Sequence, residues 1–159
     1  MDNVFYGGAF DPLTLAHERI ISELYGEYGD RLVVGVTDHD YKQSWKPVGW
    51  RRNAVWSYCQ RLCPDANVVV QDCRTFDFLS RNPDLHIGTV VVGTDEMKDL
   101  VDGKWRHSDE LLKSCRFLVI PRSDGISSTK VRNLVGDGAS DGELLEYVSM
   151  DILGRIREC

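Results

Sequence analysis

Runs of β-branched residues alternate with helix-period segments along this chain, and no other feature of the sequence constrains the fold as strongly. The runs predict five strands, at residues 4–6, 31–36, 68–70, 87–93 and 117–120. Helical spacing of apolar side chains predicts helices at residues 15–24, 51–62, 76–79, 94–101, 110–114 and 141–156, and another that opens at Ser127. Strands that alternate with helices imply parallel pairing through right-handed crossovers. We therefore predict an α/β fold: a doubly wound five-stranded parallel sheet with helices on both faces.

Length and composition fit one domain with its own core. The 159 residues are 42% hydrophobic and 28% charged, values typical of globular proteins. We expect a single domain over residues 1–159, with a C-terminal helical segment at about 127–158. The polar stretch at residues 38–50 is predicted to be a loop.

The charge and the cysteines argue against several kinds of protein. A formal charge of −6 argues against a nucleic-acid binder, which presents a basic face. No apolar run is long enough to span a membrane and no secretory signal pattern is present, so we expect a cytoplasmic protein without a membrane partner. The five cysteines are odd in number and lack a Cys-x-x-Cys pair or a nearby histidine pair. We therefore expect free thiols and no metal held by the protein.

The stretch at residues 6–17 combines a predicted strand end, two glycines and the start of a predicted helix. Glycine permits backbone angles that a side chain forbids, and it lets the main chain approach a ligand closely. The turn then directs backbone N–H groups near Ala9 and Phe10 toward an anion that lies before the helix. Thr14 and His17 are three residues apart, so we expect a hydroxyl and an imidazole on one helix face beside that anion.

Glycines and polar residues follow the predicted strands, at residues 7–8, 37–38, 93–95 and 121–122. In a doubly wound sheet, ligands bind at the carboxyl ends of the strands, near the point where the strand order reverses. The sequence therefore predicts that these distant segments converge on one cleft.

A second polar motif, Ile-Ser-Ser-Thr-Lys-Val-Arg, occupies residues 126–132. Hydroxyls before a helix usually cap it, but three in a row exceed what a cap needs. Ser128 and Arg132 are four residues apart with Thr129 close by, so hydroxyls, helix N–H groups and a guanidinium form one anion site. Ser127 belongs to this anion site.

Both motifs resemble those of a known superfamily. Residues 7–12, followed by Thr14-Leu15-Ala16-His17, resemble the signature of the HxGH/TxGH nucleotidyltransferases, and residues 126–132 resemble their ISSTxxR phosphate-binding helix start. Thr14 stands in place of the first histidine, and Ala16 in place of the usual glycine. The resemblance implies a Rossmann-like nucleotidyltransferase fold. It also implies that an acceptor phosphate attacks the α-phosphorus of a nucleoside triphosphate, which carries Mg²⁺ and releases pyrophosphate. With this resemblance we assign the anion site at residues 127–132 to the β and γ phosphates of that triphosphate.

Charge builds on the phosphate oxygens and on the leaving group in that reaction. We expect His17, Thr14, Lys42 and Arg132 to stabilise this charge by position and electrostatics, without a covalent enzyme intermediate. The nucleotide-binding set is Gly8, Ala9, Phe10, His17, Gly93, Asp95, Arg122, Ser127, Ser128, Thr129 and Arg132. A helix N-cap is the alternative role for Asp95, and a surface charge for Arg122. Asp11 is expected to form the turn rather than to act as a base.

The expected acceptor-binding residues are Lys42, Lys46, Arg51 and Trp105. The three cations lie in one short stretch, for which a solvated loop and helix start is the alternative interpretation. Arg51 is expected at a helix N-terminus, where a cation is mildly unfavourable, and this indicates a further role. The superfamily carries a phosphate-binding lysine after its second strand. Lys42 is favoured for that place, and Lys46 stays open.

The acceptor is less constrained than the reaction. Gly93-Thr94-Asp95 and Trp105 resemble the pyridine mononucleotide branch, in which an aromatic residue packs on the pyridine ring. The short link from Arg122 to Ile126 resembles glycerol-3-phosphate cytidylyltransferase, and Thr14 resembles phosphopantetheine adenylyltransferase. We predict transfer from a triphosphate, with ATP favoured, to a small phosphorylated acceptor, most closely as in nicotinate or nicotinamide mononucleotide adenylyltransferases. A non-catalytic nucleotide-binding module is the alternative of another class, and homo-oligomerisation is left open.

Overall fold

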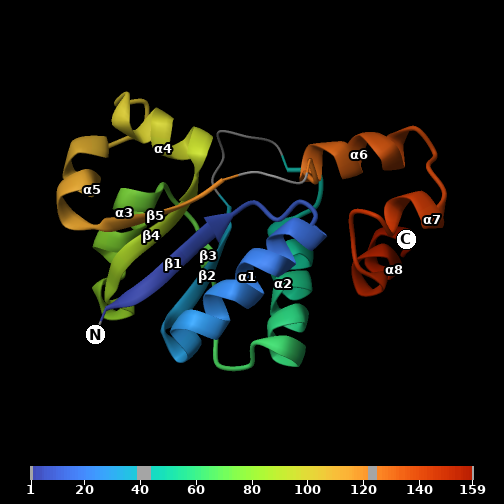
Figure 1. Ribbon diagram of the computed structural model, residues 1–159, viewed down its shortest axis with the longest axis horizontal. Helices are drawn as coiled ribbons and strands as arrows, with labels where there is room; N and C mark the ends of the chain where they lie inside the picture. Colours follow the sequence, from blue (N-terminus) through green and yellow to red (C-terminus); the bar gives the residue numbers. More distant parts are fainter. Residues whose placement is uncertain (1, 39–43, 122–124, 159) are drawn as a thin grey trace.

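The computed structural model describes residues 2–38, 44–121 and 125–158. At its centre lies a sheet of five parallel strands in the order β3-β2-β1-β4-β5 (Figure 1). The strands are β1 (Asn3–Gly8), β2 (Leu32–Thr37), β3 (Asn67–Gln71), β4 (Ile87–Gly93) and β5 (Arg116–Ile120). The chain builds outward from β1 to β3 and then returns to place β4 on the other edge of β1. The predicted doubly wound sheet is confirmed, and its strand order reverses at β1.

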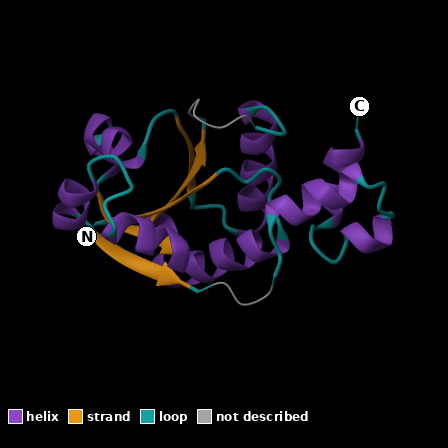
Figure 2. Cartoon of the chain, turned by 90° about the horizontal axis from the view of Figure 1, so that it is seen from above, coloured by secondary structure: helices purple, strands orange, loops and turns teal. Residues whose placement is uncertain are grey.

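Helices cover both faces of this sheet, as predicted (Figures 1 and 2). On one face lie α1 (Leu15–Tyr28) and α2 (Val48–Leu62), and on the other lie α3 (Thr75–Arg81), α4 (Thr94–Val101) and α5 (Ser108–Ser114). Two 3₁₀ turns, η1 (Gly29–Arg31) and η2 (Pro83–Leu85), precede β2 and β4. After β5 come α6 (Ser128–Gly136), α7 (Asp141–Leu144) and α8 (Met150–Arg157), at the right of Figure 1. No helix in the described ranges is long and apolar enough to cross a bilayer.

Alternate residues of the strands serve two separate cores, because successive side chains point to opposite faces of a sheet. Val4 and Val34 pack in the core with α1, α2 and the C-terminal helices. Phe5 and Val33 pack in the core with α3, around Phe78. The segment after β5 supplies Val131, Leu144, Val148, Ile152, Leu153 and Ile156 to the first core. The segment after β5 is therefore packed on the same hydrophobic core as α1 and α2.

The single helix predicted at residues 141–156 is wrong, because the chain forms α7 and α8 with a turn between them. Ser149 restarts the helix as an N-cap, with its hydroxyl accepting the Ile152 amide at 3.3 Å. The turn also releases the Tyr147 carbonyl to accept the Leu15 amide at 2.8 Å. Leu15 begins α1, so the break satisfies one of the N–H groups that a helix N-terminus leaves without an internal partner.

Helix α2 begins at Val48, inside the stretch that the sequence predicts to be a loop. Pro47 precedes it in an extended conformation, and the Arg51 amide donates to the Pro47 carbonyl at 3.1 Å to close the first turn. Arg51 therefore lies a turn inside the helix rather than at its start.

Gly7 and Gly35 are required for space. They lie opposite each other on β1 and β2, and the Phe5 ring covers both. A Cβ at Gly35 would lie 2.4 Å from that ring, and a Cβ at Gly7 would lie 2.8 Å from it. The residue with left-handed backbone angles after β1 is Phe10, with a φ of 47°. The predicted need for glycine is confirmed at Gly7, but the cause is close packing and not an unusual φ.

Candidate active site

A cavity of about 810 Å³ opens where the carboxyl ends of β1, β2, β3 and β4 meet. Its lining comes from strands β1 to β4, the turn after β1, a segment before α2, the start of α3, α4 with the loop after it, and α6. These lining residues are Phe5, Gly7, Gly8, Ala9, Asp11, Thr37, Ser44, Trp45, Gln71, Arg74, Thr75, Phe76, Val90, Val91, Val92, Glu96, Lys104, Trp105, Arg106 and Arg132. The predicted convergence of distant strand ends on one cleft is confirmed for residues 7–8 and for Thr37. Gly93 and Pro121 lie outside this lining.

His17 is held in one tautomer by the start of α1. Thr14 is the N-cap, and its backbone N–H donates to His17 Nδ1 at 3.0 Å. The Thr14 hydroxyl accepts the His17 backbone N–H at 3.4 Å and lies 3.1 Å from Nδ1. A nitrogen that accepts a hydrogen bond carries no proton, so the neutral ring has its proton on Nε2. The ring also packs edge-on against Phe10, with 5.0 Å between centroids.

The structure changes the role that the sequence assigned to Thr14. Its side chain is fully buried and bonded within the cap, so it does not open onto the cavity. Thr14 therefore positions His17 instead of contacting a phosphate directly. In a capping box the third helical residue is usually Glu or Gln, and here an imidazole takes that place.

The predicted nucleotide-binding turn has two parts. Gly8 and Ala9 line the cavity with their backbone. The Phe10 side chain is buried in the core and packs on Tyr6 and His17. Phe10 contributes to the site through its left-handed backbone and through the ring that supports His17, and not through a side chain that faces a ligand.

The second motif docks directly onto the first. Ser128 Oγ donates to the Pro12 carbonyl at 2.8 Å, and Arg132 Nη1 donates to the Asp11 carbonyl at 2.8 Å. These pairs join residues more than a hundred positions apart in the sequence. The starts of α1 and α6, each with helix N–H groups, therefore lie close together, and in this region Asp11 and Arg132 line the cavity.

Each hydroxyl of the second motif has a distinct partner. Ser127 is the N-cap of α6 and accepts the Lys130 amide at 3.1 Å. Thr129 Oγ1 accepts from Arg132 Nη2 at 3.1 Å. The bonds to Thr129 and Asp11 hold the half-buried Arg132 guanidinium in place. Two of its five N–H groups are used in this way, so donors remain for an anion in the cavity.

Asp11 and Arg51 fasten the segment Ser44–Lys46 to the turn after β1. The buried Asp11 carboxylate accepts the backbone amides of Trp45 at 2.6 Å and Lys46 at 2.9 Å. Asp11 lies in a turn, as predicted, but the partners of its carboxylate are more than thirty residues away. The same residue offers its carbonyl to Arg132, so Asp11 joins the segment Ser44–Lys46 to α6.

Arg51 is 1% exposed, and its guanidinium is used by the protein itself. It donates to the carbonyls of Lys46 at 2.9 Å, Ala9 at 2.8 Å and Thr37 at 2.7 Å. The Ser44 hydroxyl, at 3.3 Å, is a further acceptor. The prediction that Arg51 binds the acceptor is therefore corrected: this cation joins the ends of β1 and β2 to the segment before α2.

Lys46 lies against two indole rings. Its Nζ is 4.8 Å from the centroid of Trp45 and 5.4 Å from that of Trp50. Trp45 also lines the cavity, which places Lys46 next to the cavity wall. Lys42 and Arg122, the other predicted cations of the site, lie outside the described residues.

The remaining predicted residues lie on the second half of the sheet. Trp105 is half-buried against the core that contains Phe5 and lines the cavity. Gly93 is the N-cap of α4, and its amide donates to Glu96 Oε1 at 3.0 Å. Asp95 lies exposed in the first turn of α4.

Gln71, Phe76 and Glu96 line the cavity although the sequence did not single them out. Gln71 directly follows the run predicted as the third strand, so the rule that strand ends bind ligands could have found it. The sequence predicts only that Phe76 belongs to a short helix. The course of the loop that brings it to the cavity has no local sequence signal.

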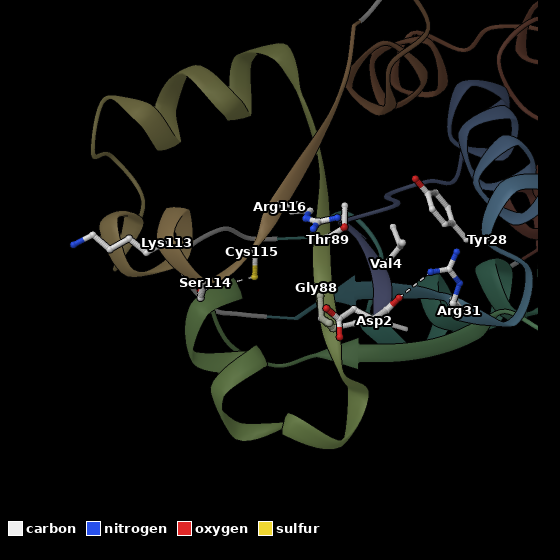
Figure 3. Close-up of a pocket in the computed structure, with 11 residues that line it drawn as sticks. Asp2, Val4, Tyr28, Arg31, Gly88, Thr89, Lys113, Ser114, Cys115 and Arg116 are labelled. Carbon is white, nitrogen blue, oxygen red and sulfur yellow. Dashed lines mark hydrogen bonds between the residues drawn. The ribbon is translucent and has the colours of Figure 1, made fainter.

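A second cavity, of about 570 Å³, lies at the opposite edge of the sheet (Figure 3). It is lined by the amino ends of β1, β4 and β5, with Asp2, Gly88 and Arg116 among its residues. Arg31 Nη1 there donates to the Asp2 carbonyl at 3.1 Å. None of the predicted site residues within the described ranges borders this cavity.

The thiols and carboxylates of the described residues offer no further catalytic centre. Burial, with a smaller effect of Cys63, raises the pKa of Cys59 to about 12, so that thiol stays protonated at neutral pH. Burial also raises the pKa values of Cys63 and Cys115. Within the described residues no three His, Cys, Asp or Glu side chains group in a way that could hold a metal ion.

Comparison with known proteins agrees with this geometry. The chain is 29% identical over 131 residues to the "Probable nicotinate-nucleotide adenylyltransferase" of Acholeplasma laidlawii (strain PG-8A). That match covers 75% of this chain and 66% of the relative, which is just under two thirds of the relative's length.

Two solved structures share the fold. "A Putative Nicotinate-nucleotide Adenylyltransferase" from Vibrio parahaemolyticus matches with a TM-score of 0.70 and 19% identity, covering 96% of each chain. Thermotoga maritima TmcAL, bound with alpha-thio ATP, matches with a TM-score of 0.66 and 15% identity, covering 98% of this chain and 55% of that one. The model of the cytidylyltransferase-like family matches residues 5–134, a span that contains both motifs. This chain belongs to the cytidylyltransferase-like family.

Proposed function

We propose that the protein transfers a nucleoside monophosphate from a nucleoside triphosphate, with ATP favoured, to a phosphate-bearing acceptor, with nicotinate or nicotinamide mononucleotide favoured as that acceptor. The observation that carries the proposal is the direct contact between the two motifs, Ser128 with Pro12 and Arg132 with Asp11. It brings two helix N-termini and a guanidinium to one end of a cavity large enough for a small ligand. The name of the Acholeplasma relative supports the choice of acceptor.

In the proposed step an oxygen of the acceptor phosphate forms a bond to the α-phosphorus. The bond from that phosphorus to the bridging oxygen breaks, and its electron pair leaves with pyrophosphate. His17 donates a hydrogen bond from Nε2–H to the phosphate oxygens, because Thr14 keeps the proton off Nδ1. Arg132 and the start of α6 hold the β and γ phosphates. The catalysis is positioning and electrostatic stabilisation.

Mg²⁺ enters this scheme with the substrate. A triphosphate in solution carries the ion on its own oxygens, and Mg²⁺ is commonly bound through substrate phosphates rather than in a cage of side chains. Its chemistry here is to neutralise charge on the phosphate oxygens and on the leaving pyrophosphate.

A second candidate is cytidylyl transfer to glycerol 3-phosphate. The family description and the short link between β5 and α6 favour it. Phosphopantetheine adenylyl transfer, which the threonine at position 14 resembles, belongs in the same comparison.

An assay of pyrophosphate release distinguishes the three candidate transfer reactions. The purified protein is assayed with each of the four triphosphates and with a pyridine mononucleotide, glycerol 3-phosphate or phosphopantetheine. We expect the highest kcat/KM for ATP with a pyridine mononucleotide. Highest turnover with CTP and glycerol 3-phosphate would select the second candidate. Triphosphate binding without turnover of any pair would contradict the enzymatic proposal and support a binding module.

A further inference from the structure

Gln71 is a buried polar side chain on the cavity wall. It ends β3, is 2% exposed and lines the cavity together with Phe5 and Gly7. Buried polar groups are almost always hydrogen-bonded, so each atom of its amide needs an account.

The hydrogen bonds of Gln71 fix which way its amide points. Nε2 donates to the Cys73 carbonyl at 2.9 Å and to Thr75 Oγ1 at 3.3 Å. A flipped amide would place two oxygens 2.9 Å apart, so the nitrogen belongs on the Cys73 side. Both N–H groups are thereby used, and Oε1 lies toward Gly7, 2.9 Å from the position that a Cβ at residue 7 would take.

Oε1 is left as an acceptor that faces the cavity. No donor from the described residues reaches it. In the described residues, Oε2 of Glu18 is the one side-chain oxygen or nitrogen that is both fully buried and without a hydrogen-bond partner. Because Oε1 of Gln71 also has no partner, it is not fully buried. The oxygen is therefore accessible, and the cavity is the space that this buried side chain borders.

Gln71 comes from a strand that carries none of the residues assigned to the triphosphate, and we expect the acceptor beside it. β3 is an edge strand, separated from β4 by β2 and β1. The residues assigned to the triphosphate lie on the turn after β1, on α6 and at the end of β4. Gln71 instead bonds to Thr75, at the start of the helix that carries Phe76.

We infer that Gln71 recognises an N–H or O–H donor at the buried end of the acceptor, such as a carboxamide or a hydroxyl, and disfavours a carboxylate there. An ionised carboxylate has no hydrogen to donate. Its oxygen and Oε1 would therefore be two acceptors in contact, with no hydrogen bond between them. This inference rests on the proposed function.

Among the described residues, the cations that line the cavity are Arg74, Lys104, Arg106 and Arg132, and two of them pair with carboxylates. Arg106 Nε pairs with Asp77 Oδ2 at 3.0 Å. Lys104 Nζ pairs with Asp99 Oδ1 at 3.6 Å. These two cations of the cavity wall therefore already have carboxylate partners, which reduces what they offer to an acidic acceptor.

The test compares two acceptors that differ in this one group, nicotinamide mononucleotide and nicotinate mononucleotide, each with ATP. We expect the amide to be favoured at least about tenfold in kcat/KM, a ratio typical of one hydrogen bond to a neutral group. Gln71→Met removes the acceptor oxygen and should bring the ratio to within about threefold of one. Gln71→Glu keeps an acceptor oxygen and should preserve the preference for the amide. Gln60→Met, on an exposed position of α2, is the matched control.

The ratio separates recognition from folding. A purely structural role of Gln71 would lower the rates with both acceptors equally and leave the ratio unchanged, which would overturn the inference. A wild-type preference for the acid, or none, would overturn it while leaving the proposed function intact. Turnover of neither mononucleotide would remove the proposed acceptor and this inference with it.

Discussion

His17 is the residue on which the proposed chemistry depends most. Its Nδ1 accepts the Thr14 amide, its ring rests on Phe10, and its proton is therefore on the nitrogen that faces away from the cap. Thr14 and His17 form the capped start of α1, so the helix geometry and the tautomer are set by one group of contacts.

Replacing His17 with alanine should lower kcat by at least about a hundredfold, because one preorganised donor to the transferring phosphate is lost. The affinity for the triphosphate should change much less, since Arg132 and the start of α6 remain. Pyrophosphate release gives kcat, and titration with a non-hydrolysable triphosphate gives the affinity. His86→Asn, at an exposed residue after η2, is the control. An unchanged kcat would remove His17 from the mechanism.

The buried contacts of Arg51 lead to a prediction about the free energy of unfolding. Replacing it with methionine leaves the carbonyls of Ala9, Thr37 and Lys46 without their donor, and buried unsatisfied groups cost about 1–3 kcal/mol each. We expect Arg51→Met to lower the free energy of unfolding by about 3 kcal/mol or more in urea denaturation. Arg81→Met, at an exposed position of α3, should change it by less than about 0.5 kcal/mol. Equal effects of the two substitutions would contradict the buried role.

The buried carboxyl group of Glu18 leads to a prediction about how stability depends on pH. Burial raises its pKa above the ordinary value of 4.5, against lowering effects of a Ser149 hydrogen bond and of Arg61, and its Oε2 has no partner in the described structure. A raised folded-state pKa means that the proton is bound more tightly when folded. The contribution of protonated Glu18 to stability is then fully present below its pKa in the unfolded state and is lost as the pH rises through its pKa in the folded state.

Glu18→Gln should therefore be more stable than the wild type at pH 7, and this advantage should shrink toward pH 4. Urea denaturation at the two pH values measures the difference. Glu23→Gln, exposed on the same helix, controls for a general effect of removing charge. An advantage of Glu18→Gln that does not change with pH would contradict the assigned cause.

Among the elements, the turn between α7 and α8 is the one that the sequence pattern concealed. Leu144, Val148, Ile152 and Ile156 keep helical spacing across it, so periodicity alone predicts one helix. The sequence does contain one sign of a new helix start, which is Ser149. Its hydroxyl caps the amide of Ile152, three residues later.

Removing that cap should destabilise the protein without unfolding it. Ser149→Ala should lower the free energy of unfolding by about 1 kcal/mol, the usual loss for an N-cap. Ser80→Ala, at an exposed position of α3, should have little effect. Thermal unfolding compares the two variants. A melting temperature of Ser149→Ala equal to that of the wild type would show that the helix start does not depend on the hydroxyl.

Strand positions were predictable because buried parallel strands are continuous apolar runs, and the bounds of β4 were predicted to the residue. The position of α2 was not, because its first turn lacks an apolar stripe and is fixed by the distant contacts of Arg51. The same limit applies to the site. Local motifs are enough to propose His17 and Arg132 from the sequence, whereas the contacts of Asp11, Arg51 and Gln71 depend on partners that only the folded chain brings near.

At the scale of the molecule, the sheet order gives the two motifs their common position. Because β1 is central, the turn after it lies where the order reverses, and α6 returns over it from β5. The C-terminal helices then share a core with α1 and α2, so the second motif is held by packing that involves the whole chain.

A crystal structure of the protein with a non-hydrolysable ATP analogue and Mg²⁺ tests this arrangement most directly. We expect the triphosphate at the carboxyl edge of the sheet, between His17 and Arg132, with its β and γ phosphates at the start of α6. A triphosphate bound instead in the cavity at the amino edge, beside Asp2 and Arg116, would contradict the account.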